Sequence, residues 1–398
     1  MVIPCHDEPD ALAPLESLRR CRRPRAAVEI LVVVNASECD GEAIRARNRA
    51  TVEALRAWQA RFDAPRMRLR VLEFPSLPAR HAGVGLARKL GMDDALARLA
   101  AAGNTDGIIA SLDADCACDA DYLVALEAHF QSHPDSRACT VYFEHDVDGP
   151  LEPELYRAMT HYELFLRYYR HGLRFAGFPH DLYTLGSCMA VRADAYARHG
   201  GMNRRRAGED FYFLNKLMAI GAVSENRATR VRPGVRASER TPFGTGRALA
   251  ERLSDAREAW LAYAPEVFAD LAALVSRIDA WYDVAPGRWQ PDTAFSPTMV
   301  EFLAAQDLRA RHAEIRSNCA SRASFKKRFF HWLDAFRALK FVHHASRHAY
   351  PRQPLESACR KLLAWQGERA PAHARQLLEV FRRRDRAPRA QRAPRIGE

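Results

Sequence analysis

Two aspartates follow an apolar segment in the first third of the chain. Ile108 to Leu112 predict a buried strand, and Asp113 and Asp115 come directly after it. The carboxyl ends of buried parallel strands are where α/β proteins bind their ligands. Two carboxylates there suit Mg²⁺ or Mn²⁺, which take further ligands from water and from phosphate oxygens. We therefore expect a metal site at Asp113 and Asp115, with an ordinary solvated loop as the alternative.

A polar loop follows the first apolar residues of the chain. Val2-Ile3 leads into a segment with Pro4, His6 and Glu8, which predicts a second loop at the carboxyl end of a strand. A carboxylate such as that of Glu8 can accept hydrogen bonds from the N–H groups of a nucleobase. On its own the segment is also typical of a plain loop. Because strands usually have about five or six residues, we expect the complete chain to begin a few residues earlier.

Two glycines open a predicted helix whose first turn carries cations. Gly83 and Gly85 are followed by Arg88 and Lys89. Free N–H groups at a helix start, together with two basic side chains, attract a diphosphate. The spacing does not match a dinucleotide fingerprint, because Arg88 stands where its third glycine belongs, and no P-loop motif occurs. A Rossmann dehydrogenase or a P-loop enzyme is therefore not expected.

Two acids begin another predicted helix. Glu209 and Asp210 follow Gly208. Acids at a helix start stabilise it by ~0.3–1 kcal/mol, which is the structural interpretation. The functional interpretation makes Asp210 a general base that takes a proton from an attacking hydroxyl. Further along, residues 236–246 form a loop rich in arginine and glycine, in which Arg240 could neutralise phosphate charge or belong to a plain linker.

Predicted strands and helices, which must position these residues, alternate in the first part of the chain. Short β-branched segments and helical segments alternate up to residue 246, which predicts an α/β sheet with crossover helices. After residue 246, apolar residues recur at helical spacing and strand signals stop. We expect a catalytic domain over residues 1–246, a helical region over 247–384, and a basic disordered tail over 385–398.

Composition narrows the class of protein. The 398 residues carry 60 basic and 49 acidic side chains, so the net charge is +11. No segment approaches the ~20 apolar residues of a membrane span, and we expect a cytoplasmic protein, with association at the inner membrane face left open. The nine cysteines include no Cys-x-x-Cys pair, which indicates neither a disulfide framework nor a zinc site.

The order of these motifs resembles the family 2 glycosyltransferases of the GT-A fold. The resemblance rests on the loop from Pro4 to Glu8, the helix start with Arg88, the Asp113-Ala114-Asp115 motif and the Glu209-Asp210 pair. It covers residues 1–246. The second strand ends at Asn35, where the family usually carries an acid. The resemblance implies a mixed, mainly parallel sheet flanked by helices, followed here by an all-helical region.

The resemblance also implies an activity. This is an inverting, metal-dependent, hexosyltransferase-like transfer from a nucleotide-diphosphate sugar to a hydroxyl of a saccharide, a lipid-linked acceptor or a small molecule. Asp113 and Asp115 would hold Mn²⁺ or Mg²⁺, and Asp210 and Glu209 would be the catalytic acids. The residues implied in donor binding are Pro4, His6, Glu8, Asn35, Arg88, Asp113 and Arg240.

Two other interpretations stay open at the level of sequence. A sugar-phosphate nucleotidyltransferase can carry an acid-pair metal site on a related sheet, but it needs no base on the acceptor side. A basic protein that binds nucleic acid or an anionic surface would use the arginine-rich tail. Nucleic acid is the less favoured partner.

Overall fold

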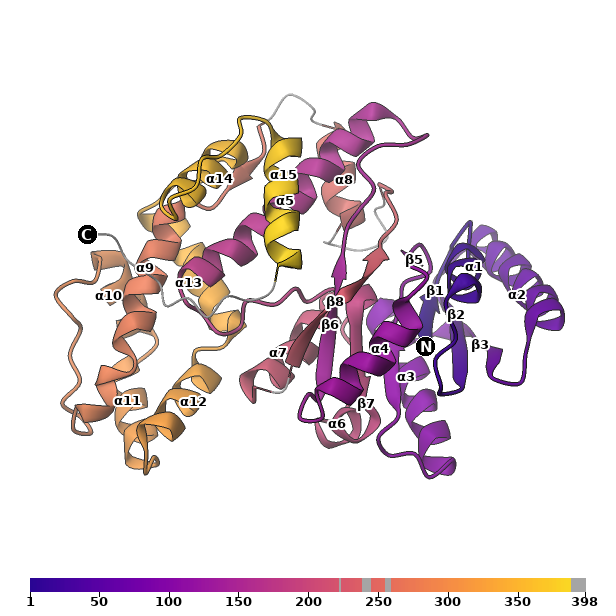
Figure 1. Cartoon of the computed structure of the whole chain (residues 1–398), viewed down its shortest axis with the longest axis horizontal. Helices are drawn as coiled ribbons and strands as arrows, with labels where there is room; N and C mark the ends of the chain where they lie inside the picture. Colours follow the sequence, from indigo (N-terminus) through magenta and orange to yellow (C-terminus); the bar gives the residue numbers. More distant parts are fainter. Residues whose placement is uncertain (222, 238–244, 255–258, 388–398) are drawn as a thin grey trace. The chain divides into compact units, whose positions relative to one another are not determined.

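The structure is a computed structural model that describes residues 1–221, 223–237, 245–254 and 259–387 (Figure 1). Its contacts divide the chain into two units. The first comprises Met1–Met159 and Tyr183–Ser254, and the second comprises Thr160–Leu182 and the described residues of Asp255–Glu398.

An eight-stranded sheet forms the centre of the first unit, with the order β3-β2-β1-β4-β7-β6-β8-β5. The strands β1, β2, β3 and β4 are parallel, β7 runs antiparallel to both β4 and β6, and β6 and β8 are parallel. The predicted mixed, mainly parallel sheet of GT-A type is confirmed. The strands are β1 (Val2–Cys5), β2 (Val28–Ser37), β3 (Met67–Leu77), β4 (Ile108–Ser111), β5 (Ala117–Cys118), β6 (Ala138–Phe143), β7 (Met189–Arg192) and β8 (Val223–Arg232).

Helices of the first unit cover this sheet (Figure 1). They are α1 (Ala13–Arg20), α2 (Glu42–Phe62), α3 (Val84–Ala101), α4 (Tyr122–Ser132), α6 (Ala193–Arg198) and α7 (Glu209–Ala219), with a 3-10 turn η1 (Gly186–Cys188) before β7. The unit also contains α8 (Thr245–Ser254). The helix α5 (Pro153–Phe175) begins in this unit and continues into the second.

Close packing of α3 fixes the position of its first turn. A Cβ atom at Gly91 would lie 2.5 Å from Val2 and 2.8 Å from Val33, so only glycine allows α3 to approach β1 and β2 this closely. On the other face of β2, Val34 and Ala36 lie toward Val52 of α2, as alternation along a strand requires. Arg88, one turn before Gly91, is thereby held against the carboxyl ends of the central strands.

The sheet has a topological switch point between β1 and β4. From β1 the chain proceeds outward to β2 and β3, and it then returns to place β4 on the other side of β1. Such a switch point is where open α/β sheets bind ligands, beyond the carboxyl ends of the strands. β1 pairs with β2 along all four residues but with β4 only at Val2. Pro4 has no N–H to extend that pairing, so the two strands part where their polar loops begin.

The second unit is helical apart from one short antiparallel pair. Its elements are the rest of α5, α9 (Pro265–Arg277), η2 (Ala280–Asp283), α10 (Pro297–Ala305), α11 (Leu308–Ser317), α12 (Arg322–Trp332), α13 (Ala335–His348), α14 (Leu355–Ala364) and α15 (Ala374–Arg386). The two-residue strands β9 (Leu261–Ala262) and β10 (Gln353–Pro354) correct the expectation of an all-helical region. Two residues per strand leave too short a period-2 pattern to detect in the sequence. Among the described helices, none has both the length and the apolar character needed to cross a membrane.

Charged side chains are buried between α5 and α15 in this unit. Asp385 is fully buried and accepts hydrogen bonds from Arg167 at 2.6 Å and from His171 at 2.9 Å, and Glu163 pairs with Arg382. These contacts extend α15 through Arg386, so the predicted disordered tail does not include Asp385 or Arg386. Residues 388–398 of that predicted tail lie outside the described residues.

Candidate active site

Arg88 connects the segments that the sequence analysis singled out. Its Nε donates to Ser111 Oγ at 2.9 Å, its Nη2 to Asp113 Oδ1 at 2.5 Å, and its Nη1 to the Glu209 carboxylate. Arg88 and Glu209 are each only 2% exposed. Removing one partner of such a buried ion pair strongly destabilises the folded protein, because the other charge is left buried without a partner. Arg88 therefore joins α3, the end of β4 and the start of α7 into one unit.

This geometry corrects the expected role of Arg88. Its sequence context predicts contact with a diphosphate, but all three guanidinium nitrogens bond protein oxygens and the side chain is buried. Lys89, on the next position, pairs with Asp93 at 2.8 Å, one helical turn along α3. The first turn of α3 thus contributes to the site by positioning Asp113 and Glu209.

Asp115 lies in a concentration of negative charge. Burial among protein atoms and the neighbouring carboxylates of Asp113 and Glu8 raise the pKa of Asp115 to about 6, while Arg236 opposes the shift. The side chain is nevertheless 35% exposed, so a solute can reach it. A carboxylate with a raised pKa next to two other acids is a site that favours a cation.

Arg236 is the cation that faces this cluster. It donates to both oxygens of Glu8, at 2.8 and 2.9 Å, and its Nη2 lies 3.9 Å from Asp115 Oδ2. Gly234 makes the close approach possible, since a Cβ there would lie 2.8 Å from the Asp115 carbonyl oxygen. The segment after β8 is therefore packed onto the Asp113-Ala114-Asp115 turn. Arg240, the arginine of this loop that the sequence indicated, lies outside the described residues, and no sequence signal distinguished Arg236.

Asp210 is oriented by two backbone groups. Its Oδ2 accepts from the Gly186 N–H at 2.8 Å, and its Oδ1 accepts from the Phe211 N–H at 2.7 Å. Gly208, at φ +70°, provides the left-handed turn that begins α7. Burial is the main cause of a raised Asp210 pKa, with the Asp113 charge adding to it and Arg88 acting against it. A carboxylate held this way can accept a proton nearer neutral pH than a free aspartate can.

The loop after β1 is tied to the end of β2. The carbonyl of Asn35 accepts from His6 Nδ1 at 2.8 Å and from Asn48 at 2.9 Å. Pro4 is buried in β1, opposite Val33. The structure therefore brings Pro4, His6, Glu8 and Asn35 together at the carboxyl ends of β1 and β2, and Glu8 uses both carboxylate oxygens for Arg236.

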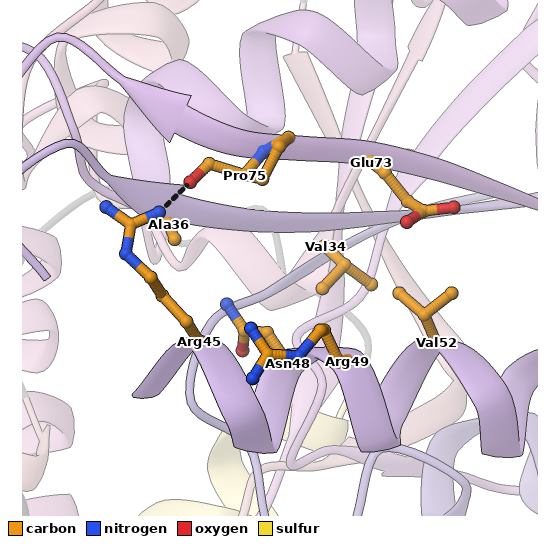
Figure 2. A pocket seen from close by; sticks show the side chains of 8 residues that line it. All are labelled: Val34, Ala36, Arg45, Asn48, Arg49, Val52, Glu73 and Pro75. Atoms are coloured by element: carbon orange, nitrogen blue, oxygen red, sulfur yellow. Dashed lines mark hydrogen bonds between the residues drawn. The ribbon is translucent and has the colours of Figure 1, made fainter. Parts of the chain in front are cut away.

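A separate cavity of about 130 Å³ lies between α2 and the ends of β2 and β3. Figure 2 shows Arg45 of α2 reaching toward β3, where it donates to the Pro75 carbonyl at 2.6 Å. Arg45 also donates to the carbonyls of Ser37 and Asp40. Its role is to hold the turn from β2 into α2, and the cavity lining includes neither of the paired aspartates nor Asp210.

Comparisons with known proteins give a distant structural likeness. No protein-family model matches the chain, and no curated protein matches it in sequence. Crystal structures of S. aureus TarS 1-349 cover 80% of this chain and 89% of their own. The structure without a named ligand is 13% identical with a TM-score of 0.40, the complex with UDP-GlcNAc is 12% identical with 0.43, and the complex with UDP is 13% identical with 0.41. These values are too low to transfer residues or an activity.

The carboxylates of Asp113 and Asp115 suit a metal ion that takes its other ligands from water and a bound phosphate. Among the described residues, no group of three or more His, Cys, Asp or Glu side chains is arranged to hold a metal ion. Asp113 and Asp115 supply two carboxylates, and Asp113 is 37% exposed. Mg²⁺ and Mn²⁺ commonly bind through one or two carboxylates and complete their shell with water and phosphate oxygens. The residues present therefore fit such an ion together with a phosphorylated ligand.

Proposed function

We propose that this chain is an inverting glycosyltransferase that moves a sugar from a nucleotide-diphosphate sugar to a hydroxyl acceptor. One observation carries the proposal: Arg88 links Asp113 at the end of β4 to Glu209, and Asp210 follows Glu209 at the start of α7. These contacts group acids that are distant in sequence at the switch point of the sheet, which supports a division between acids for the donor phosphates and an acid for the acceptor.

The two acid sets have different tasks in this proposal. Asp113 and Asp115 would hold Mn²⁺ or Mg²⁺, which supplies positive charge to the leaving diphosphate. Arg236 lies beside Asp115 and adds a second positive charge on the donor side. The transition state of sugar transfer is oxocarbenium-like, as in glycoside hydrolysis. Stabilising the charge of the leaving group and positioning the acceptor therefore matter more than a strong nucleophile.

Asp210 is the general base of the proposal. Its carboxylate is fixed by the N–H groups of Gly186 and Phe211 and retains lone pairs for an acceptor hydroxyl. The resemblance implied that Glu209 is a catalytic acid as well, but Glu209 is 2% exposed and paired with Arg88. We assign Glu209 to positioning, because a buried and paired carboxylate does not touch the acceptor. A nucleotidyltransferase would leave Asp210 without a task.

The test is the identity of the product. UDP-, GDP- and dTDP-sugars are incubated with Mn²⁺ and a panel of hydroxyl acceptors, and released nucleotides are separated by chromatography. We expect a nucleoside diphosphate and a glycosylated acceptor. A parallel incubation contains pyrophosphate and no acceptor, and formation of a nucleoside triphosphate and a sugar 1-phosphate from the nucleotide-sugar would favour the nucleotidyltransferase.

The Asp210→Asn variant tests the base directly. Loss of a general base typically costs about 10²- to 10⁴-fold in kcat, while the donor Kd should stay within twofold. Asp106→Asn, at the amino end of β4 and on an exposed side chain, is the matched control and should keep wild-type turnover. Wild-type kcat in Asp210→Asn would remove Asp210 from the proposal.

A further inference from the structure

Two buried thiols meet where the first helix reaches the edge of the sheet. Cys21 Sγ and Cys118 Sγ are 3.7 Å apart, and the two residues are 4% and 5% exposed. Cys21 is the residue that ends α1, and Cys118 lies in β5. This contact joins segments 97 residues apart in sequence.

The two backbones are anchored side by side at this point. The Arg22 N–H donates to the Ala120 carbonyl at 2.7 Å, and Ser17 Oγ accepts from the Cys118 N–H at 3.3 Å. A disulfide needs its sulfurs ~2.05 Å apart and its Cβ atoms ~3.5–4.5 Å apart. The two sulfurs are 3.7 Å apart and therefore have less than ~2 Å to close.

The position of β5 gives the pair a route to solvent. It is a two-residue strand at the edge of the sheet and pairs only with β8 among the described strands. Short edge elements with few backbone hydrogen bonds open locally at low cost. On the other side, Cys21 is followed by the exposed Arg22 and Arg23.

The two sulfurs are not equivalent. A hydrogen bond from Cys118, opposed by burial, places the pKa of Cys21 below its ordinary value, whereas the same contact and burial raise the pKa of Cys118. Thiolates are the attacking species in thiol–disulfide exchange. Cys21 also lies next to the exposed, basic Arg22 and Arg23, so we place the first attack at Cys21, and Cys118 resolves the product.

We infer that Cys21 and Cys118 form a reversible disulfide by exchange with a small-molecule disulfide such as oxidised glutathione. The Cys21 sulfur attacks the small disulfide, whose S–S bond breaks, and the first glutathione leaves with the proton that Cys21 has lost. The Cys118 sulfur then attacks the Cys21 sulfur, the mixed disulfide breaks, and the second glutathione leaves with the Cys118 proton. Two protein thiols are oxidised, and one small disulfide is reduced to two thiols.

The crosslink would tie α1 to the segment that carries the paired aspartates. Cys118 is three residues beyond Asp115, and Asp119 N–H already bonds the Arg230 carbonyl. Any effect of the crosslink on donor binding rests on the proposed function. Formation of the crosslink does not, so the two ideas fail separately.

Peptide mapping tests the inference. The folded full-length protein is incubated with oxidised glutathione, remaining thiols are alkylated, and the digest is analysed by mass spectrometry before and after dithiothreitol. We expect a Cys21–Cys118 linked peptide that dithiothreitol releases. Cys39, the exposed cysteine, reports that the reagent is active by forming a mixed disulfide with glutathione. Free thiols at Cys21 and Cys118 beside a modified Cys39 would overturn the inference.

Variants and melting temperature provide the second readout. Cys39→Ser should keep the linked peptide, whereas Cys21→Ser and Cys118→Ser should lose it. A crosslink that closes a long loop restricts the unfolded chain, so oxidation should raise the Tm of wild type by several degrees and leave that of Cys118→Ser unchanged. A linked peptide that forms only in denaturant, or an equal Tm shift in Cys118→Ser, would contradict the assignment.

Discussion

Replacing Arg88 by methionine should unfold the candidate active site. Methionine keeps most of the apolar volume of the side chain but leaves Glu209, which is 2% exposed, with an unpaired buried charge. Breaking a buried ion pair by removing one partner costs about 3–5 kcal/mol. We expect a loss of this size in the free energy of unfolding of the first unit, with loss of turnover.

Hydrogen exchange of the β2 backbone amides measures this loss in the first unit alone. The strand is buried from Ile30 to Ala36, so its slowest amides report global opening of that unit. Arg98→Met is the matched control from the same helix. Arg98 pairs with Glu29 at 2.6 and 2.8 Å, but both side chains are about one third exposed. An exposed pair of this kind contributes about 0–1 kcal/mol.

A double-mutant cycle distinguishes ion pairing from packing. Glu209→Gln removes the buried charge, so the Arg88→Met/Glu209→Gln variant should be destabilised by less than the sum of the single variants. Coupling energies between contacting residues are about 0.5–3 kcal/mol. Additive losses, or an Arg88→Met variant no less stable than Arg98→Met, would refute the assignment of Arg88 as the link between the aspartate pair and α7.

Two further predictions concern Asp115 and Gly186. The pKa of Asp115 is raised to about 6, so protonation of Asp115 competes with a bound cation below that pH. Mn²⁺ affinity measured by titration calorimetry should therefore be about tenfold weaker at pH 5 than at pH 7. Equal affinity at the two pH values would contradict this prediction. A Cβ at Gly186 would lie 2.6 Å from the Arg88 guanidinium, and that group is held by three bonds. Gly186→Ala should therefore cost about 1–3 kcal/mol of unfolding free energy and lower turnover, and an unchanged Tm would show that Arg88 moves freely.

The sequence predicts β1, β2 and β4 because apolar residues there are followed by polar ones. Polar residues begin near Pro4, Asn35 and Asp113, although β1 continues to Cys5 and β2 to Ser37. The helix α2 follows an amphipathic pattern whose buried residues include Val52, Leu55 and Trp58. Local composition cannot show how a side chain is used once distant segments meet. Arg88 has the sequence context of a residue that binds phosphate. Its burial against Glu209 depends on the packing of α7, which the local sequence does not show.

The helix α5 shows where sequence patterns fail. Its buried residues include Glu163, Arg167 and Arg170, so charges occupy positions that a hydrophobic pattern assigns to solvent. Their partners Arg382 and Asp385 are more than 200 residues away. The same long-range pairing explains why α15 is ordered at residues that resemble a basic tail. Arg236 is likewise one of several arginines near the end of β8. It differs from the others because Gly234 packs against Asp115 and so brings Arg236 to Glu8.

Donor binding tests the central claim most directly. The dissociation constants of UDP-, GDP- and dTDP-sugars are measured with and without Mn²⁺ for wild type, Asp115→Ala and Asp106→Asn. We predict that at least one nucleotide-sugar binds wild type and Asp106→Asn in a Mn²⁺-dependent manner, and that Asp115→Ala loses this dependence. Equal, Mn²⁺-dependent binding by Asp115→Ala, or no binding of any nucleotide-sugar to the wild-type protein, would contradict the account.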